Sequence, residues 1–171
     1  MIQVIKMIIR EAQEQDFKAI LNIMNFYIQN TTYTFTTEIQ TMEKLTRWYH
    51  QLGSRYPFLV ADLHGVIAGY AYLSPYRPKE AYQHTAELTI YLDRAYQGKG
   101  VGGKLMKAIL DQAAERNFHT VISVITSDNR SSIAFHKRFG FQYAGELKEV
   151  GYKKNSWIST VYYQWMSSRN R

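Results

Sequence analysis

The segment Thr85-Ala86-Glu87-Leu88-Thr89-Ile90-Tyr91-Leu92 is followed, four residues later, by the glycine-rich segment Gln97-Gly98-Lys99-Gly100-Val101-Gly102-Gly103. Apolar residues occupy alternate positions of the first segment, which predicts a strand with one apolar face. Leu105, Ile109 and Ala113 follow the glycines at helical spacing. Unpaired amide groups meet at the positive start of a helix, and glycine lets an anion approach the backbone closely. The sequence therefore predicts a phosphate-binding turn between a strand and a helix.

The turn differs from two common phosphate motifs. A Walker loop requires Gly-x-x-x-x-Gly-Lys-Ser/Thr, whereas Lys99 is followed by Gly100 and Lys104 by Leu105. A dinucleotide-binding fold places its glycines near the first strand of the chain, whereas here they follow residue 90. Glycines also suit a tight strand-to-helix junction, so the turn alone leaves an anion site and a purely structural junction both open.

Outside this unit, strand and helix patterns alternate along the chain. Strands are predicted at 4–9, 57–61, 66–73, 119–125, 141–150 and 156–165, with the second and third forming an antiparallel pair. Helices are predicted from a cap at Asp16 to Ile28, from a cap at Thr41 to Leu52, from the glycines to near Asn117, and over 129–139. Loops are expected at 31–37 and 74–82, and a turn at 151–155. This order favours an α/β architecture, with a mixed sheet and helices on both faces, in one domain spanning residues 1–171.

The composition is that of an ordinary globular protein, with 46% hydrophobic and 20% charged residues. The chain has no cysteine, which excludes disulfides, thiolate metal sites and cysteine nucleophiles. The run Met7-Ile8-Ile9 is too short for a secretion signal, and no stretch approaches the roughly 20 apolar residues of a membrane span. The formal charge of +7 attracts phosphates in general, but Lys and Arg never occur in runs longer than two. We therefore expect a soluble, cytoplasmic protein that binds neither a membrane nor nucleic acid.

Several motifs resemble one enzyme family. Gln97-x-x-Gly100-x-Gly102 is similar to the acyl-CoA-binding signature Gln/Arg-x-x-Gly-x-Gly/Ala of the GNAT N-acetyltransferases, and Asn129 with the later Phe139-Gly140-Phe141 resembles that family's downstream helix and strand. The segments 30–32, 56–61, 69–72, 86–91 and 151–157 resemble the phosphinothricin and methionine sulfone/sulfoximine acetyltransferase branch. The resemblance implies the GNAT fold, a largely antiparallel central sheet with a splayed parallel pair. It also implies acetyl-CoA as acyl donor, a small-molecule amine as acceptor, and a homodimer.

The resemblance assigns the acyl donor to three parts of the chain. The backbone of Ile90, Tyr91 and Leu92 would bind the pantetheine arm and polarise the thioester carbonyl. The turn would bind the pyrophosphate through Gln97, Gly98, Lys99, Gly100, Val101, Gly102 and Gly103. Asn129 would bind the pantetheine arm, and Ser132 faces the same way one helical turn on. Asn129 is also a good helix cap in its own right, and both roles can hold together.

Two side chains are expected to move protons. Glu87 lies on the polar face of its strand and could take a proton from the acceptor ammonium group, as the matching Glu of the branch is implicated in doing. His136 stands where many family members have a Tyr thought to protonate the thiolate, and histidine can transfer protons at neutral pH. The alternatives are an exposed carboxylate for Glu87 and a packed or capping histidine for His136.

The acceptor is expected near the loop that precedes the strand 85–92. Arg77, beside Tyr76, suits bidentate recognition of a carboxylate, sulfonyl or phosphinate oxygen pair. Tyr33 and Phe35 could form a wall of the acceptor pocket, and Thr85 and Glu87 are also expected to contact the acceptor. A solvated arginine and core packing of the two aromatic residues remain the alternatives.

The remaining histidines, His50, His64, His84 and His119, lack metal-ligand spacing, so no metal is expected. No Gly-x-Ser-x-Gly elbow is present, and direct attack by the amine is the simpler mechanism. The leading hypothesis is acetylation of the α-amino group of phosphinothricin, methionine sulfoximine or methionine sulfone. Acetylation of a polyamine, an aminoglycoside or a protein amine, a non-catalytic acyl-CoA sensor, and a basic nucleic-acid binder are the alternatives.

Overall fold

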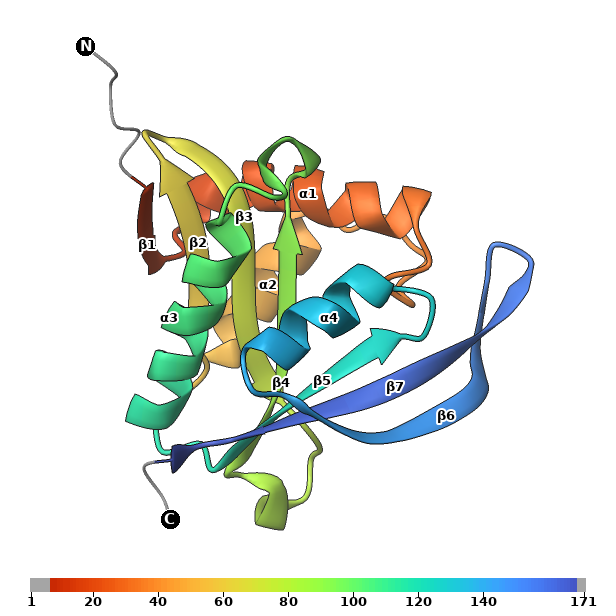
Figure 1. Cartoon of the computed structure of the whole chain (residues 1–171). Coiled ribbons are helices and arrows are strands. Elements are labelled where there is room, and N and C mark those ends of the chain that lie inside the picture. Colours follow the sequence, from red (N-terminus) through yellow and green to blue (C-terminus); the bar gives the residue numbers. More distant parts are fainter. Residues whose placement is uncertain (1–6, 169–171) are drawn as a thin grey trace.

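The computed structural model describes residues 7–168, and within this range seven strands form one sheet (Figure 1). The strand order is β1-β2-β3-β4-β5-β7-β6, and every neighbouring pair is antiparallel except β4 with β5. The strands are β1 (Met7–Glu11), β2 (Phe58–Leu63), β3 (Val66–Pro75), β4 (Thr85–Leu92), β5 (Thr120–Thr126), β6 (Gln142–Lys153) and β7 (Ser156–Met166). The predicted mixed sheet with one parallel pair is confirmed.

Four α-helices cover the two faces of the sheet: α1 (Phe17–Asn30), α2 (Met42–Leu52), α3 (Val101–Glu115) and α4 (Arg130–Arg138). Figure 1 shows α3 and α4 in front of the sheet and α1 and α2 behind it. Side chains of a strand alternate between faces, and β2 follows this rule: Phe58 and Val60 join the core with α1 and α2, whereas Leu59 and Ala61 join the core with α3. Helices therefore cover both faces, as predicted.

The parallel pair separates along its length. β4 pairs with β5 only over Thr85 to Glu87, opposite Thr120 to Ile122, whereas its antiparallel pairing with β3 continues to Leu92. The carboxyl half of β4 thus has no strand on its β5 side, and the two strands form a V that opens at their carboxyl ends (Figure 1). This is the splayed pair that the resemblance implied.

Four local predictions need correction. Residues 4–6 of the first predicted strand lie outside the described residues, and β1 runs on to Glu11. The predicted turn at 151–155 is wrong, because β6 continues to Lys153 and only Lys154 and Asn155 turn, with φ of 52° and 58°. A two-residue hairpin turn of this kind needs positive φ at both positions, which Asn tolerates better than most residues.

The third correction concerns Asp16, which precedes α1 but makes no side-chain cap to it. Its carboxylate instead accepts a hydrogen bond of 2.8 Å from the amide of Gln13 and forms an ion pair of 2.7 Å with Arg10. The predicted cap at Thr41 is confirmed, since its side chain accepts from the amide of Lys44. The loop predicted at 74–82 begins later, because Ser74 and Pro75 still belong to β3.

Candidate active site

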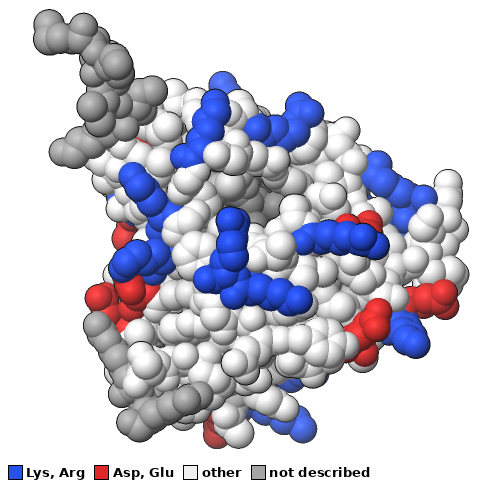
Figure 2. Space-filling view, viewed as in Figure 1, with Lys and Arg blue, Asp and Glu red and all other residues white. Residues whose placement is uncertain are grey.

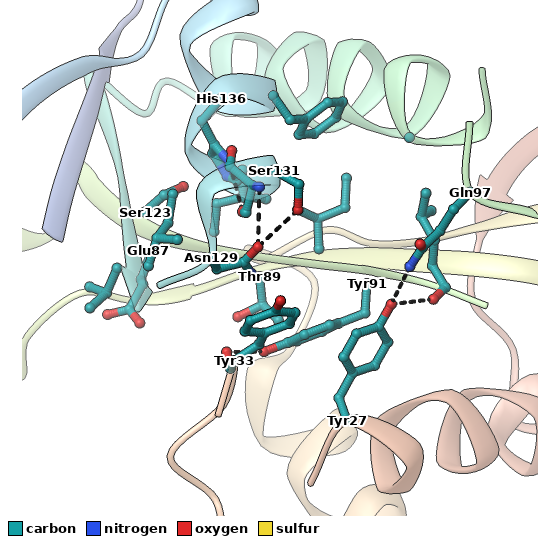
Figure 3. Close-up of a pocket in the computed structure, with 18 of the residues that line it drawn as sticks. Tyr27, Tyr33, Glu87, Thr89, Tyr91, Gln97, Ser123, Asn129, Ser131 and His136 are labelled. Carbon is teal, nitrogen blue, oxygen red and sulfur yellow. Dashed lines mark hydrogen bonds between the residues drawn. The ribbon is translucent and has the colours of Figure 1, made fainter. Parts of the chain in front are cut away.

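A cavity of about 380 Å³ occupies the V between β4 and β5 (Figure 3). Its lining comes from both sheet faces. Leu88 packs with the core on the α3 side, so alternation places Glu87 and Thr89 on the α1 side. The V is therefore a passage through the sheet. The lining residues are Tyr27, Tyr33, Glu87, Leu88, Thr89, Ile90, Tyr91, Leu92, Gln97, Gly98, Gly102, Ser123, Val124, Ile125, Asn129, Ser131, Ser132, Phe135 and His136.

The backbone of β4 presents polar groups to this passage. The amide of Asp93 donates to the carbonyl of Ala68, which makes the preceding pair, Leu92 with Gly69, a non-hydrogen-bonded pair of the β3–β4 ladder. Pairs alternate in such a ladder, so the N–H and C=O groups of Leu88, Ile90 and Leu92 point away from β3 and toward the V. The backbone N–H and C=O of Tyr91 point to β3, so Tyr91 lines the cavity through its side chain alone. Two of these groups are already used, because the C=O of Leu92 accepts from Tyr27 and the pairing of Glu87 with Ile122 uses the N–H of Leu88. The N–H and C=O of Ile90 and the N–H of Leu92 are left to face the cavity.

The glycine turn closes the wide end of the V. Gly98 and Gly100 have φ of +71° and +80°, values that favour glycine, and α3 begins directly afterwards at Val101. The unpaired amides of the first turn of α3 and the positive end of its dipole meet here. The side chain of Val101 is buried in the core, so only its backbone can meet a ligand. The turn has the geometry of an anion site.

Positive charge surrounds this end of the molecule. Figure 2 shows Lys and Arg side chains gathered over the face that carries α3 and α4. Lys99, Lys104, Arg130 and Lys137 are exposed and belong to the turn and to these two helices. An anionic ligand is favoured at such a surface.

Glu87 lies at the narrow end of the V, at the last residue paired with β5. Burial raises the pKa of its carboxyl, and the positive charge of Arg77 partly opposes that rise. A carboxylate with a raised pKa in a cleft is suited to accept a proton near neutral pH. Arg77 itself is exposed and stacks over the ring of Tyr76, with its guanidinium carbon 5.2 Å from the ring centroid.

His136 faces the cavity from α4 and is 3% exposed. Its Nδ1 lies 2.8 Å from the carbonyl oxygen of Ser132, which can only accept, so Nδ1 carries the proton of the neutral ring. Nε2 then presents a lone pair. Burial lowers the pKa of His136, although the hydrogen bond to Ser132 partly opposes this effect. The ring is thus neutral at pH 7 and can accept a proton.

Asn129 and Ser123 complete this wall. The Asn129 side chain caps α4 by accepting from the amide of Ser132, at 3.2 Å, and from the hydroxyl of Ser131, at 3.1 Å. Its amide nitrogen can still donate to a ligand. Ser123 is the first residue of β5 after the segment that pairs with β4. It is 1% exposed, and its hydroxyl has no hydrogen-bond partner among the described residues.

The loop between α1 and α2 covers the α1 side of the passage. The hydroxyl of Tyr91 donates a 3.0 Å hydrogen bond to the carbonyl of Tyr33, and the ammonium group of Lys153 donates one of 2.7 Å to the carbonyl of Thr34. Phe35 packs against Gly151, where an added Cβ would come within 2.4 Å of the ring. The loop is therefore held between β4 and the β6–β7 hairpin.

The structure brings many of the predicted residues into one cavity, including Glu87, His136 and Asn129 together with Tyr33, Ile90, Tyr91, Leu92, Gln97, Gly98, Gly102 and Ser132. The other predicted residues do not line it: Phe35, Tyr76, Arg77, Thr85, Lys99, Gly100, Val101 and Gly103. Tyr27, Ser123 and Phe135 line it but were not predicted. No local motif marks them, because their position depends on how α1, β5 and α4 pack around the V.

Two further observations concern only residues 7–168. No helix there combines the length and hydropathy needed to cross a membrane. The same residues contain no group of three His, Asp or Glu side chains placed to hold a metal ion.

Comparison with known proteins agrees with this geometry. Residues 9–162 match the acetyltransferase (GNAT) domain family. The chain is 35% identical to phosphinothricin N-acetyltransferase of Streptomyces viridochromogenes, over 91% of this chain and 85% of that protein. It is 32% identical to the L-methionine sulfoximine/L-methionine sulfone acetyltransferase of Pseudomonas paraeruginosa, over 91% and 92%. A GNAT phosphinothricin acetyltransferase from Sinorhizobium meliloti, solved with acetyl-CoA, superposes with a TM-score of 0.89 at 30% identity, over 94% and 88%.

Proposed function

Because this chain belongs to the GNAT acetyltransferase family, we propose that it acetylates the α-amino group of a small amino acid analogue such as phosphinothricin, methionine sulfoximine or methionine sulfone. The observation that carries this proposal is the passage between β4 and β5, which has an anion-binding turn at one end and Glu87 at the other. Relatives named for these acceptors support the choice of substrate class.

Acetyl-CoA fits the passage as the acyl donor. The pyrophosphate would bind the amides of Gly98 to Gly103, with Lys99 adding charge. The pantetheine arm would pair with the outward backbone groups of Ile90 and the N–H of Leu92, and with the side-chain amide of Asn129. The N–H group of Ile90 would then polarise the thioester carbonyl. The reacting carbon would then lie toward the narrow end of the V, near Glu87.

The acceptor would approach from the α1 side. Glu87 accepts a proton from the ammonium group, directly or through one water, and the neutral amine attacks the thioester carbon. The new C–N bond forms as the carbonyl π electrons move to oxygen, and the C–S bond then breaks with its electron pair leaving on sulfur. Arg77, in the loop beside Glu87, would bind the acceptor's carboxylate or phosphinate oxygens, while Tyr33 and Phe35 limit its size.

The protonation state of His136 suggests how the proton reaches sulfur. Since Nδ1–H is directed to the Ser132 carbonyl, the ring cannot begin the cycle as an acid. Nε2 would accept the proton that the attacking nitrogen loses as C–S cleavage proceeds, and would then pass it to the thiolate. The lowered pKa of His136 favours this return of the proton.

The assembly and location are part of the same proposal. Five large apolar side chains are exposed on the β6–β7 hairpin, namely Tyr143, Leu147, Val150, Tyr152 and Trp157. Apolar surface of this kind suits an interface between two copies of the chain, with the acceptor loop close by. We propose a cytoplasmic homodimer, to be tested by light scattering of the wild type and of Trp157→Lys.

The activity is tested by free-thiol release from acetyl-CoA. L-phosphinothricin, L-methionine sulfoximine and L-methionine sulfone are assayed in parallel with spermidine, an aminoglycoside and a no-acceptor control. Turnover with the first three, lost in Glu87→Gln, supports the proposal. Turnover with a polycation alone would refute the acceptor class. Binding of acetyl-CoA without turnover of any amine would indicate a sensor instead.

A further inference from the structure

The side chain of Tyr27 joins α1 to the end of β4 and to the start of the glycine turn, which lie 65 and 70 positions later in the chain (Figure 3). From α1, its hydroxyl donates a hydrogen bond of 2.7 Å to the carbonyl of Leu92 and accepts one of 2.9 Å from Nε2 of Gln97. Tyr27 is buried, and its ring centroid lies 4.6 Å from that of Tyr91. Burial raises the pKa of the phenol, so the hydroxyl keeps its proton and remains a donor at neutral pH.

Leu92 is fixed at both its backbone and its side chain. Its carbonyl points toward the V and would have no strand to bond if Tyr27 did not donate to it. Its side chain fits between two glycines, because a Cβ added at Gly69 would lie 2.5 Å from Cδ2 and one at Gly102 would lie 3.2 Å from Cδ1. The end of β4 is therefore fixed relative to both β3 and α3.

Gln97 forms a hydrogen bond to the same hydroxyl of Tyr27. Its side-chain nitrogen donates to Tyr27, and its backbone amide donates to the carbonyl of Arg94 at 3.3 Å. Gly98 follows directly and lines the cavity. The side chain of Gln97 thus fixes the first residue of the glycine turn against α1, 70 positions earlier in the chain.

We propose that the Tyr27 hydroxyl is a positioning group for the acyl donor, which sets the distance between the outward edge of β4 and the glycine turn. The inference rests on the proposed function, in which one extended ligand binds both parts at once. A ligand that spans two sites gains full affinity only when the spacing between them is held in advance. Tyr27 and Gln97 then act on donor binding rather than on the chemical step.

The test compares Tyr27→Phe and Gln97→Met with the wild type. Acetyl-CoA affinity is measured by titration calorimetry, and kcat at saturating acetyl-CoA by thiol release. We expect the Kd of acetyl-CoA to rise roughly threefold to tenfold in each variant, the range for losing about one net hydrogen bond. The kcat at saturation should stay within about twofold of the wild type, because Glu87 and His136 are unaffected.

Tyr49→Phe is the matched control. The hydroxyl of Tyr49 also donates to a backbone carbonyl, that of Ala12 at 2.9 Å, but Tyr49 lies outside the passage. Both Tyr→Phe variants should melt at similarly reduced temperatures, and only Tyr27→Phe should weaken acetyl-CoA binding. S-acetylpantetheine, which lacks the pyrophosphate, provides a second control, because its kcat/KM should be nearly the same for Tyr27→Phe and wild type.

The outcomes separate this inference from the proposed function. If a folded Tyr27→Phe binds acetyl-CoA as the wild type does, or if Tyr49→Phe weakens binding equally, the positioning role is wrong while the acetyltransferase proposal stands. If Tyr27→Phe does not fold, the Kd and kcat of Gln97→Met decide the question. A wild-type protein that binds no acetyl-CoA would refute the proposed function and, with it, the positioning role.

Discussion

The hydroxyl of Tyr91 donates a hydrogen bond of 3.0 Å to the backbone carbonyl of Tyr33 and so ties β4 to the loop between α1 and α2. The same residue contacts Tyr27 through its ring. Tyr91 thus contacts Tyr27 of α1, next to the proposed acyl-donor site, and also contacts the loop between α1 and α2, next to the proposed acceptor site. The ring makes the contact with Tyr27, whereas the hydroxyl makes the hydrogen bond to the loop, so the two contacts can be removed separately.

Replacing Tyr91 by Phe keeps the ring and removes the hydrogen bond to the loop. We expect the KM for the amino acid acceptor to rise about threefold to tenfold, since one net hydrogen bond that orders Tyr33 is lost. The KM for acetyl-CoA should change little. Steady-state kinetics with each substrate varied in turn measures both constants. A larger change for acetyl-CoA than for the acceptor would contradict this division of roles.

Glu87 should control the acid limb of the pH–rate profile. Burial raises its pKa, so the carboxylate is lost by protonation at a higher pH than for a free Glu, and kcat should fall as the pH drops through that raised pKa. Glu87→Gln should reduce kcat by roughly 10² to 10⁴ and abolish this limb. Calorimetry on Glu87→Gln should still detect acetyl-CoA binding.

Arg77 provides an independent check on that limb. Its positive charge lowers the pKa of Glu87, so its removal should raise that pKa further. The acid limb of Arg77→Gln should therefore lie at higher pH than that of the wild type, with a raised KM for the acceptor. Arg55→Gln, which replaces a cation outside the passage, serves as the control. If the acid limb of Arg77→Gln lies at the same pH as that of the wild type, a group other than Glu87 is responsible for the limb.

The sequence predicts those features of the site that depend on local pattern. The bounds of β4, the cap at Thr41 and the glycine turn follow from alternation, capping residues and glycine spacing. The splay of β4 from β5 came from family resemblance, because nothing in the composition of either strand indicates where their pairing stops. The turn at Lys154 was misplaced because two non-glycine residues adopt positive φ there.

The unpredicted side chains depend on contacts between distant segments. In the sequence, Ser123 is one residue of a strand pattern that is otherwise mostly apolar, and nothing marks it as a site residue. It lines the cavity because β4 stops pairing with β5 at Ile122, the residue before it. Tyr27 reads as one of several apolar residues of α1, although it bonds to Leu92 and Gln97. Likewise, the signature glutamine predicts a ligand contact, but the sequence does not show that its side-chain nitrogen also donates to Tyr27.

His136 should make the wild type less stable below neutral pH. Burial lowers its pKa in the folded state, whereas the unfolded chain titrates near 6.5. Well above pH 6.5 both states are neutral. As the pH falls below that value, the unfolded state binds the proton first and stability is lost. Urea denaturation at pH 7.5 and pH 5.5 should show a smaller pH effect for His136→Gln than for the wild type.

The control for this measurement is His119→Gln, since His119 is exposed. The raised pKa of Glu87 acts with the opposite sign, because protonation of its buried carboxyl stabilises the folded state as the pH falls. That contribution is common to the wild type and both variants and cancels in the comparison. An equal pH effect in the wild type and His136→Gln would mean that His136 is not the group responsible.

Two buried threonines on the neighbouring strands β5 and β7 should respond oppositely to the loss of a hydroxyl. Thr160 on β7 is buried, and its hydroxyl has no hydrogen-bond partner among residues 7–168, so folding removes it from water without compensation. Thr160→Val replaces the hydroxyl by a methyl group of similar shape and should raise the free energy of unfolding by about 1 kcal/mol. Thr120 on β5 is also buried, but its hydroxyl donates to the carbonyl of Trp165 at 2.9 Å and accepts from Gln164 at 3.0 Å.

Thr120→Val should therefore lower the free energy of unfolding by about 1 to 3 kcal/mol, because the partners in Trp165 and Gln164 lose their hydrogen bond within the protein. Chemical denaturation of the two variants and the wild type measures both changes under one set of conditions. Since both substitutions exchange the same atoms at buried strand positions, β propensity and side-chain volume cancel, and the difference isolates hydrogen bonding. A destabilised Thr160→Val would imply that its hydroxyl has a partner in solution, such as a buried water bonded between Thr160 and Thr126.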